Sequence, residues 1–470
     1  MEGRAISNRL KICFLWLCLI LQLFDSSNLY GQYSSPIDSS LRISKKKFIP
    51  LLEAIAINAI VNRFDVWVQD ADWARISLKS WSDNFKYGFE TDGDRFSTNF
   101  LGHPLHGALY YNAARSCGFS YWESIPNVVV GSLMWEFLGE TERASEIDVN
   151  TTTIGGLFLG EISHRLSISL TDNHNNRRFK PFRRSAAFLL NPMGQINSWF
   201  YDDVKKNLHS KNYNSVPLRS MIGIGGNLPY GEAINSPPTT RLQLNYQLIY
   251  GDLFSRKTKY TPFDFFNLKA WLDFSFADVE KPIYFNMTSH APLARFKLND
   301  NSLLCISQHY DFLHNLIFEQ GDLCITADYA FKKTTNKINL ITSMKAGFTL
   351  FGSTSSEIID FLIAQGTLTT DRDYIYGKGL ALESEFFLSI KKLGALTVSY
   401  NSWFLYTSRD ANGTENSQIL KINHRIPVYK RFSIGTEFYT YHRQSTYKVE
   451  GFQNIKKGYS EFRLISNYSF

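Results

Sequence analysis

The chain has 470 residues, 15% of them aromatic, and carries a formal net charge of +7 at pH 7. This positive excess is small and spread along the sequence, so it does not indicate a nucleic-acid partner. Beyond residue 31 the cysteines are widely spaced, which excludes a disulfide scaffold and a zinc ribbon. They are Cys117, Cys305 and Cys324.

Residues 1–31 have the layout of a secretory signal peptide. Arg4, Arg9 and Lys11 form a positive segment before an apolar run, Ile12 to Phe24, that is short for a membrane span. Small and polar residues up to Gly31 provide a cleavage site. We therefore expect export through a cleaved signal peptide.

Residues 32–215 are predicted to form a helical domain with a basic linker. "FIPLLEAIAINAIVNRF" has the length of a helix with Pro50 near its first turn, and "IPNVVVGSLMWEFLGE" starts in the same way at Pro126. "TTTIGGLFLGEISHRL" carries Gly156 and Gly160 at a spacing that permits close helix packing. The linker "HNNRRFKPFRRSAAF" is rich in arginine, as a solvated or anion-facing segment would be.

Within this domain, residue types that carry chemistry fall on neighbouring predicted helices. His103 and His106 share one helix face, Glu136 and Glu140 share a face of the next helix, and Asp148 follows in a loop. Two imidazoles and two carboxylates could bind a divalent metal or form an acid–base pair. They could equally satisfy one another's hydrogen bonds, since a buried polar group without a partner costs about 1–3 kcal/mol.

We expect the second arrangement, a polar network without metal or cofactor. The alternative is a divalent metal at the histidines and glutamates, with catalysis by the same residues or by Asp148. The candidate ligands are His103, His106, Glu136 and Glu140.

Residues 216–470 alternate apolar and polar residues in segments of about ten. In "RLQLNYQLIY", Leu242, Leu244 and Tyr246 share one face while Gln243 and Asn245 share the other. Aromatic-rich strands of this kind are typical of an outer-membrane β-barrel, and we count about twelve. This even number places the start of the first strand and the end of the last strand on the same, periplasmic side. The predicted fold is α+β: an antiparallel transmembrane barrel preceded by a helical plug domain, periplasmic or lumenal. A soluble β-sandwich is the alternative.

The last ten residues, "EFRLISNYSF", are the most specific part of this pattern. The strand places alternate apolar side chains on one face and ends on an aromatic residue, which resembles the signature that the outer-membrane barrel assembly machinery reads. The residues of this assembly signal are Phe462, Leu464, Tyr468 and Phe470. The expected partners are this machinery and the lipid and lipopolysaccharide of the outer membrane.

Several blocks of the sequence also resemble a family. "NFLGHPLHGALYYNAARSCGFSYWES", "GSLMWEFLGE" and "RDYIYGKG" are similar to blocks of an uncharacterised domain-of-unknown-function family of Gram-negative outer-membrane proteins. The resemblance covers about Trp73 to Gly379. It implies an envelope protein and supplies no activity.

Two classes of function remain open on this evidence. The first is a channel, transporter or structural envelope protein with a helical plug. The alternative is a lipid- or envelope-modifying hydrolase that uses the cluster of His103, His106, Glu136 and Glu140, with or without a metal. A weaker enzymatic option pairs Ser307 with His309 on one strand face, in the reverse of the order found in outer-membrane lipid hydrolases.

Overall fold

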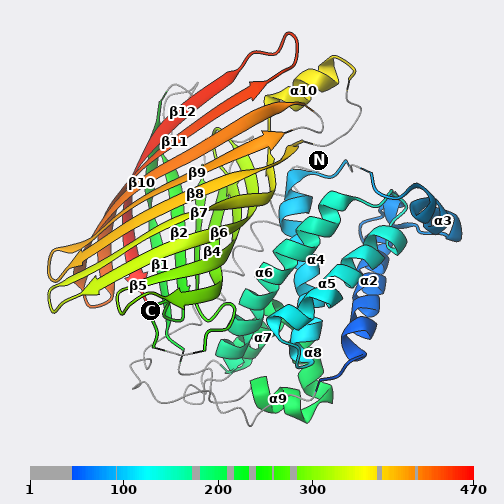
Figure 1. Cartoon of the computed structure of the whole chain (residues 1–470), viewed down its shortest axis with the longest axis horizontal. Helices are drawn as coiled ribbons and strands as arrows, with labels where there is room; N and C mark the ends of the chain where they lie inside the picture. The colour runs from blue at the N-terminus through cyan, green and yellow to red at the C-terminus, as the bar shows by residue number, and fades with distance from the viewer. Residues whose placement is uncertain are drawn as a thin grey trace.

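The computed structural model describes residues 45–470 apart from short gaps at 91–92, 172–179, 209–215, 232–239, 257–258, 276–282, 368–372 and 408–410. The signal peptide therefore lies outside the described residues. A helical region comes first and a sheet of antiparallel strands follows it (Figure 1).

Twelve antiparallel strands close into a barrel because the last strand, β12, pairs with the first, β1. The closed ring confirms the predicted twelve-stranded barrel. We call the end of the barrel that holds Leu218 and Phe470 the proximal end, and the opposite end the distal end. The strands are β1 (Leu218–Tyr230), β2 (Arg241–Tyr250), β3 (Phe266–Phe274), β4 (Ile283–Lys297), β5 (Ser302–His314), β6 (Glu319–Thr334), β7 (Ile338–Thr354), β8 (Ile375–Ile390), β9 (Gly394–Thr407), β10 (Gly413–Tyr429), β11 (Phe432–Tyr447) and β12 (Ile455–Ser469).

Alternation along each strand separates an outward apolar face from an inward polar face. On β12, Phe462, Leu464 and Tyr468 point outward and are exposed, whereas Glu461 and Arg463 point inward and are buried. Because side chains on a strand alternate with period two, one register fixes both faces along the strand. The residues of the predicted assembly signal within β12 thus lie on the outer face.

The lumen is filled by its own side chains. Lys269 on β3 forms an ion pair with Glu385 on β8, five strands away around the wall. The turn after β5 reaches across the distal end, where Arg443 of β11 donates a hydrogen bond to the carbonyl of Ile317 at 3.2 Å. α10 (Glu357–Ala364) packs over the same end through Ile358 and its neighbours. The inward side chains therefore meet across the barrel.

The helical region contains α2 (Ile49–Trp67), η1 (Asp72–Ala74), α3 (Leu78–Tyr87), η2 (Thr98–Gly102), α4 (His103–Ser116), α5 (Tyr121–Leu138), α6 (Glu146–Thr171), α7 (Lys180–Leu190), α8 (Pro192–Phe200) and α9 (Asp202–Leu208). Among the described residues, none of the helices combines the length and the apolar character needed to cross a membrane.

Helices α4 and α6 form the closest pair in this region. A Cβ on Gly107 would lie 1.9 Å from the carbonyl oxygen of Thr152, and one on Gly156 would lie 2.5 Å from the backbone of Gly107. Gly160 likewise makes room for the ring of Tyr111. The glycine spacing seen in the sequence therefore serves close helix packing, as expected.

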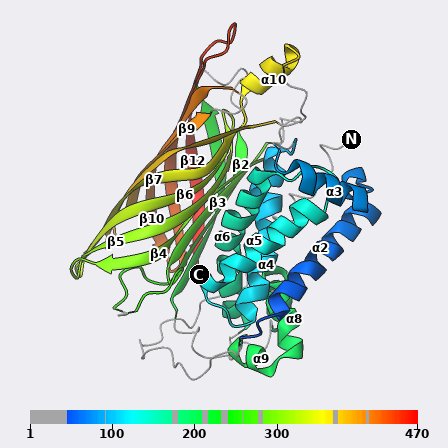
Figure 2. The same cartoon turned by 45° about the vertical axis from the view of Figure 1, so that its right-hand side comes forward.

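The helices lie against the outside of the barrel wall (Figures 1 and 2). On β5, Ser307 and His309 face the lumen, so Gln308, Tyr310 and Phe312 face outward. Phe312 packs on the ring of Phe96, and the Tyr310 ring stacks on Phe158 of α6. Of the two placements that the sequence left open for the helical domain, the lumenal one does not hold, because the helices cover part of the outer wall.

Candidate functional site

The clearest group of reactive side chains surrounds His103, the first residue of α4. Its Nε2 lies 3.4 Å from a carboxylate oxygen of Asp94 and 3.6 Å from one of Asp148. Its Nδ1 lies 3.2 Å from the hydroxyl of Thr152. His103 and Asp148 are buried, while Asp94 is partly exposed. The Nδ1 side of the imidazole thus meets a hydroxyl, and the Nε2 side meets two carboxylates.

The sequence around the start of α6 explains why Asp148 is held there. The hydroxyl of Ser145 accepts a hydrogen bond from the backbone N–H of Asp148 at 3.2 Å, which is a helix N-cap contact. The backbone N–H of Ser145 in turn donates to a carboxylate oxygen of Glu136 at 2.8 Å. A carboxylate at this position is also favoured by the positive end of the helix dipole. Asp148 and Thr152 then lie one helical turn apart and face the same histidine.

The structure divides the residues that the sequence singled out. His103 and Asp148 come together, and the group also includes Asp94. Within the part of the chain that the structure describes, these three have ligand atoms that all lie within 4.8 Å of one another. The residues His106, Glu136 and Glu140 belong to no group of three or more that meets this criterion among the described residues.

The remaining candidates have structural partners. His106 Nε2 lies 2.9 Å from the hydroxyl of Tyr110, which also bonds to Asn58 of α2. Glu136 holds the start of α6, as described above. The carbonyl of Glu140 accepts a hydrogen bond from Asn84 at 3.2 Å. These contacts tie α2, α3, α4, α5 and α6 together.

Asp94 and Thr152 were missed by the sequence reasoning. Asp94 lies in an irregular stretch before η2, where no helical or strand period reveals its direction. The signal that could have found it is the short spacing from Asp94 to His103, because a chain that enters a helix can fold back on its first turn. Thr152 could have been found four residues after Asp148 on the same helix face.

A second buried cluster sits in the middle of the bundle around Glu161 of α6. Its carboxylate accepts hydrogen bonds from Arg115 Nε at 2.8 Å and from Arg165 Nε at 2.7 Å, and the hydroxyl of Tyr111 donates to it as well. Glu161 is fully buried. Three donors from two helices therefore converge on this one buried carboxylate.

The serine and histidine pair of the lumen does not form a nucleophile and base. The Ser307 hydroxyl donates to Asp328, whereas His309 Nε2 lies 2.9 Å from the hydroxyl of Thr326. A nucleophilic serine needs its base within hydrogen-bond reach. The different partners of the two side chains argue against that option.

A cavity of about 430 Å³ opens at the proximal end, between the start of α5 and the turn that joins β2 to β3. Cationic and aromatic side chains line it together. They are Arg256, Lys259, Arg295, Lys297, Trp122 and Tyr260.

The closed sheet with apolar residues outside and polar residues inside defines a barrel of the outer-membrane type. Residues 88–193 match the family model described as "Domain of unknown function (DUF3943)". The match lies within the span that resembles such a family and confirms the resemblance there. No curated protein matches the chain.

Among solved structures, the outer membrane channel DcaP of Acinetobacter baumannii is 9% identical and has a TM-score of 0.25, covering 54% of this chain and 97% of that one. The KdgM porin is 9% identical with a TM-score of 0.25, covering 53% of this chain and 99% of that one. The COG4313 outer membrane channel from Pseudomonas putida F1 is 12% identical with a TM-score of 0.27, covering 54% and 95%. The architecture of this chain rests on its own strand pairing.

Proposed function

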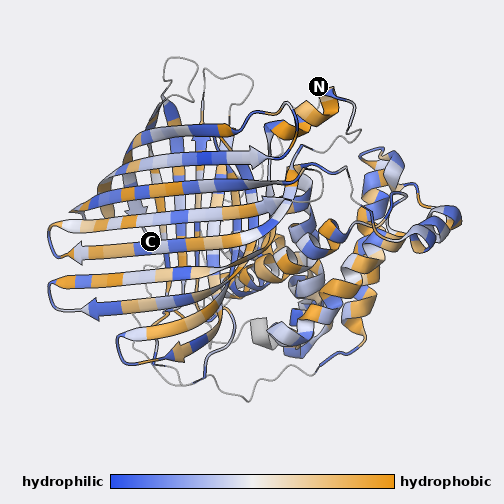
Figure 3. Cartoon of the chain, turned by 45° about the horizontal axis from the view of Figure 1, so that its top comes forward, coloured by the Kyte–Doolittle hydropathy of each residue, from blue (hydrophilic) through white to orange (hydrophobic). Residues whose placement is uncertain are grey.

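We propose that this protein is an outer-membrane β-barrel, exported with a cleaved signal peptide, whose closed barrel anchors a helical bundle beside it within the lipid bilayer. Its role is a structural one in the envelope. The observation that carries the proposal is that large apolar side chains are exposed both on the outward face of the strands and on the outward faces of the helices. Figure 3 shows that hydrophobic and hydrophilic residues alternate along the elements of both regions.

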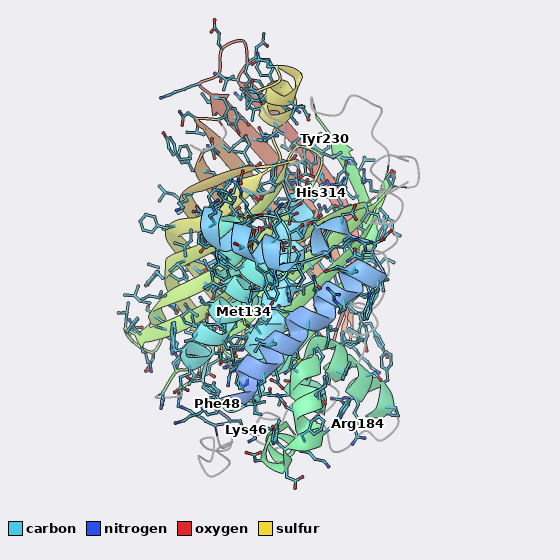
Figure 4. All side chains as sticks on the ribbon, turned by 90° about the vertical axis from the view of Figure 1, so that its right-hand side faces the viewer. Lys46, Phe48, Met134, Arg184, Tyr230 and His314 are labelled. Carbon is cyan, nitrogen blue, oxygen red and sulfur yellow. The ribbon has the colours of Figure 1, made fainter. Side chains whose placement is uncertain are left out.

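Helix α2 shows the polarity of a lipid-facing helix. Ile60, Phe64 and Trp67 point away from the protein and are exposed, at 69%, 51% and 75%. Asn62 and Asp65 point inward and are buried. A helix in water would place these two sets the other way round. Figure 4 looks onto this side of the bundle, with Phe48 labelled before the start of α2.

Helix α5 has the same arrangement as α2, with apolar side chains exposed and polar side chains buried. Trp122 and Val130 are exposed, whereas Ser124, Ser132 and Glu136 are buried. The Ser124 hydroxyl donates to the carbonyl of Ser120 at 2.8 Å, and the Glu136 carboxylate accepts from the backbone N–H of Ser145 at 2.8 Å, as a low-dielectric surrounding favours. A helix that buries its polar residues in this way needs apolar residues only on its outward face.

The bundle extends along the height of the barrel. At the proximal end, Arg165 of α6 donates to the carbonyl of Pro262 at 2.7 Å, in the turn between β2 and β3. At the distal end, Asp373, just before β8, accepts a hydrogen bond from the backbone of Phe96 at 2.8 Å. α6 has 26 residues, a length of about 39 Å against a hydrocarbon layer of about 30 Å. This extent along the barrel supports the proposed position of the bundle beside the part of the strands that would meet lipid.

The outward face of β5 carries a polar side chain where the helices cover it. Gln308 points away from the lumen, yet it is buried. Its amide donates to the carbonyl of Ile154 at 2.9 Å and accepts from the hydroxyl of Tyr121 at 2.9 Å. A glutamine facing lipid would have no such partners. The wall therefore carries polar contacts where the helices cover it and apolar residues where they do not.

The filled lumen favours a structural role over a pore. The ion pair between Lys269 and Glu385 crosses the interior, and the turn at Ile317 and helix α10 cover the distal end. Water-filled barrels leave their inner side chains exposed to solvent, whereas Arg463 in this lumen is fully buried.

The proximal cavity fits the same placement. Arg256, Lys259 and Trp122 line it at the barrel end that would face the periplasm. Aromatic and basic side chains gather at the level of lipid headgroups in membrane proteins. This supports the outer membrane, with its lipid and lipopolysaccharide, as the surroundings of the bundle.

In-cell photo-crosslinking tests the proposal. A benzophenone amino acid would replace Ile60 on α2, Leu464 on the barrel wall, or Lys391 in a proximal turn. We expect the Ile60 and Leu464 variants to form lipopolysaccharide or phospholipid adducts and the Lys391 variant to form none. If the Ile60 variant, like the Lys391 variant, formed no lipid adducts while the Leu464 variant did, the proposed position of the bundle in lipid would be contradicted.

A second candidate function is modification of an envelope lipid by the group around His103. The observation that favours it is the partly exposed Asp94 beside a buried histidine, an arrangement that a general base or a bound ion can use. Lipid analysis of cells that carry the wild type or His103→Ala tests it. A changed lipid product in the variant supports an enzyme, and identical lipid profiles argue for the structural role alone.

A further inference from the structure

We propose that Asp94, His103 and Asp148 bind a divalent first-row transition-metal ion at the distal end of the helical bundle. The site requires no particular location of the bundle, so it stands or falls independently of the structural role proposed above.

The distances are those of ligands that share one ion. His103 Nε2 lies 3.4 Å from Asp94 Oδ2 and 3.6 Å from Asp148 Oδ2. Nitrogen and oxygen ligands bind zinc at about 2.0–2.2 Å, and two such ligands at a tetrahedral angle are about 3.4 Å apart. The ligand atoms of all three residues lie within 4.8 Å of one another, so side-chain rotations that draw the two carboxylates together would let one ion contact all three.

The histidine is oriented for this purpose. Its Nδ1 faces the Thr152 hydroxyl at 3.2 Å, which directs Nε2 toward the two carboxylates. Metal-binding histidines commonly bond their second ring nitrogen to a neighbouring polar group, which fixes the tautomer and the ring plane. Asp148 and Thr152 are both on α6, so this one helix supplies a ligand and the support for another.

The chemistry of the ligands limits the ion. One imidazole and two carboxylates suit zinc, manganese or iron better than a soft ion that prefers thiolates. Three protein ligands leave at least one coordination position for water or for an oxygen of another molecule. The side chain of Asp94 is 37% exposed, against 9% for His103 and 4% for Asp148, so the site can be entered from the side of Asp94.

A protonated His103 paired with both carboxylates would have similar distances, and the experiment must separate the two states. The full-length protein would be purified from outer membranes without a metal-affinity tag and analysed for bound metals. It would then be stripped with a chelator and titrated with Co²⁺, whose visible absorption reports coordination by protein ligands. We expect about one ion per chain and a saturable Co²⁺ band.

The variants assign the ligands. We expect Asp94→Asn and His103→Gln to lose the band, and Thr152→Val to weaken Co²⁺ binding by about 10–100-fold. His106→Gln is the matched control, since this histidine lies on the same helix but bonds to Tyr110. It should bind Co²⁺ like the wild type.

Asp94→Asn is the decisive variant because a partly exposed carboxylate can be replaced with little risk to folding. Heat-modifiable gel mobility would show that each variant keeps its barrel. Wild-type protein with no stoichiometric metal and no saturable Co²⁺ band would overturn the proposal. So would an Asp94→Asn and a His103→Gln protein that both bind Co²⁺ as tightly as the wild type.

Discussion

The barrel and the helical bundle both expose apolar side chains on their outer sides and bury polar ones, but the two kinds of residue repeat along the sequence with different periods. Each has a face on which apolar side chains are exposed while neighbouring polar ones are buried, as for Leu464 and Arg463 on β12 and for Ile60 and Asn62 on α2. On a strand this pattern appears as strict alternation, whereas on a helix it is spread over a period of 3.6 residues. Under the proposed placement in lipid, the shared surroundings account for the shared pattern in two different types of element.

The two regions differ in how they satisfy their polar groups. The barrel closes its hydrogen bonds around a ring, so its stability depends on every strand being in place. The bundle depends on a few buried clusters, among them the one around Glu161. Changes in each region should therefore have separate consequences.

The largest expected effect breaks the barrel alone. Deletion of Tyr468 to Phe470 removes the end of β12, which pairs with β1 to close the ring. We expect the truncated protein to fail to assemble in the outer membrane. Fractionation and heat-modifiable gel mobility measure this outcome, and normal levels of folded, membrane-inserted protein would refute the prediction.

The next effect breaks the bundle alone. Glu161→Leu leaves Arg115 and Arg165 buried without their shared carboxylate. Loss of one partner of a buried ion pair costs about 3–5 kcal/mol. We expect faster hydrogen exchange in α4 and α6 and unchanged exchange in β7 to β12, because local stability need not follow global stability. Equal acceleration in these strands would show that the two regions unfold as one unit.

A third prediction compares the cost of an arginine on the outward face of α2 with its cost on the outward face of the barrel. Arginine in place of Ile60 on α2 should destabilise the protein by about 2.5–3.5 kcal/mol if this position lies deep in lipid. The same substitution on a water-exposed surface would stay within about 0.5 kcal/mol. Phe348→Arg on the outward face of β7 provides the reference for lipid, and Thr335→Arg in a proximal turn provides the reference for water. Denaturant unfolding from lipid vesicles measures all three.

The smallest expected effect concerns α10, the helix that packs over the distal end of the barrel. Burial works to raise the pKa of Glu357 at the start of α10, but Arg443 and a hydrogen bond from Lys457 hold this pKa below its ordinary value. A lowered carboxyl pKa stabilises the folded state above the unfolded-state pKa, and this contribution is lost as the pH falls through the folded-state value. We therefore expect α10 to loosen below the ordinary glutamate value of 4.5.

A fluorescent probe at Phe361 would report this opening of α10. Glu357→Gln should remove most of the pH response in that range. A response of the same size in the variant would assign the titration to another group.

The barrel could be predicted from sequence because its signals are local. Alternation fixes the faces of each strand, and the short turns such as Lys392 to Gly394 fix the antiparallel order. The position of the helices could not be read in this way. Gln308 and Tyr310 look like ordinary strand residues, and their partners Ile154 and Phe100 lie far away along the chain.

The candidate site shows the same limit. Helical periodicity drew attention to His103, but it grouped this residue with His106, which shares its helix, and not with Asp94. Asp94 precedes the helix in an irregular segment, so only the tertiary fold brings it to the histidine. The inverted polarity of α2 was also hidden, because a sequence shows that a helix has two faces but not which one the protein covers.

The most direct test of the central claim is the solvent accessibility of a nitroxide spin label at Ile60 in lipid nanodiscs. Its relaxation by oxygen, which concentrates in lipid, would be compared with relaxation by a water-soluble nickel chelate, using labels at Leu464 and Lys391 as references. The account predicts that the Ile60 label resembles the label at Leu464, with high oxygen and low nickel accessibility. A label at Ile60 that resembles the one at Lys391 would contradict it and place the helical bundle in water.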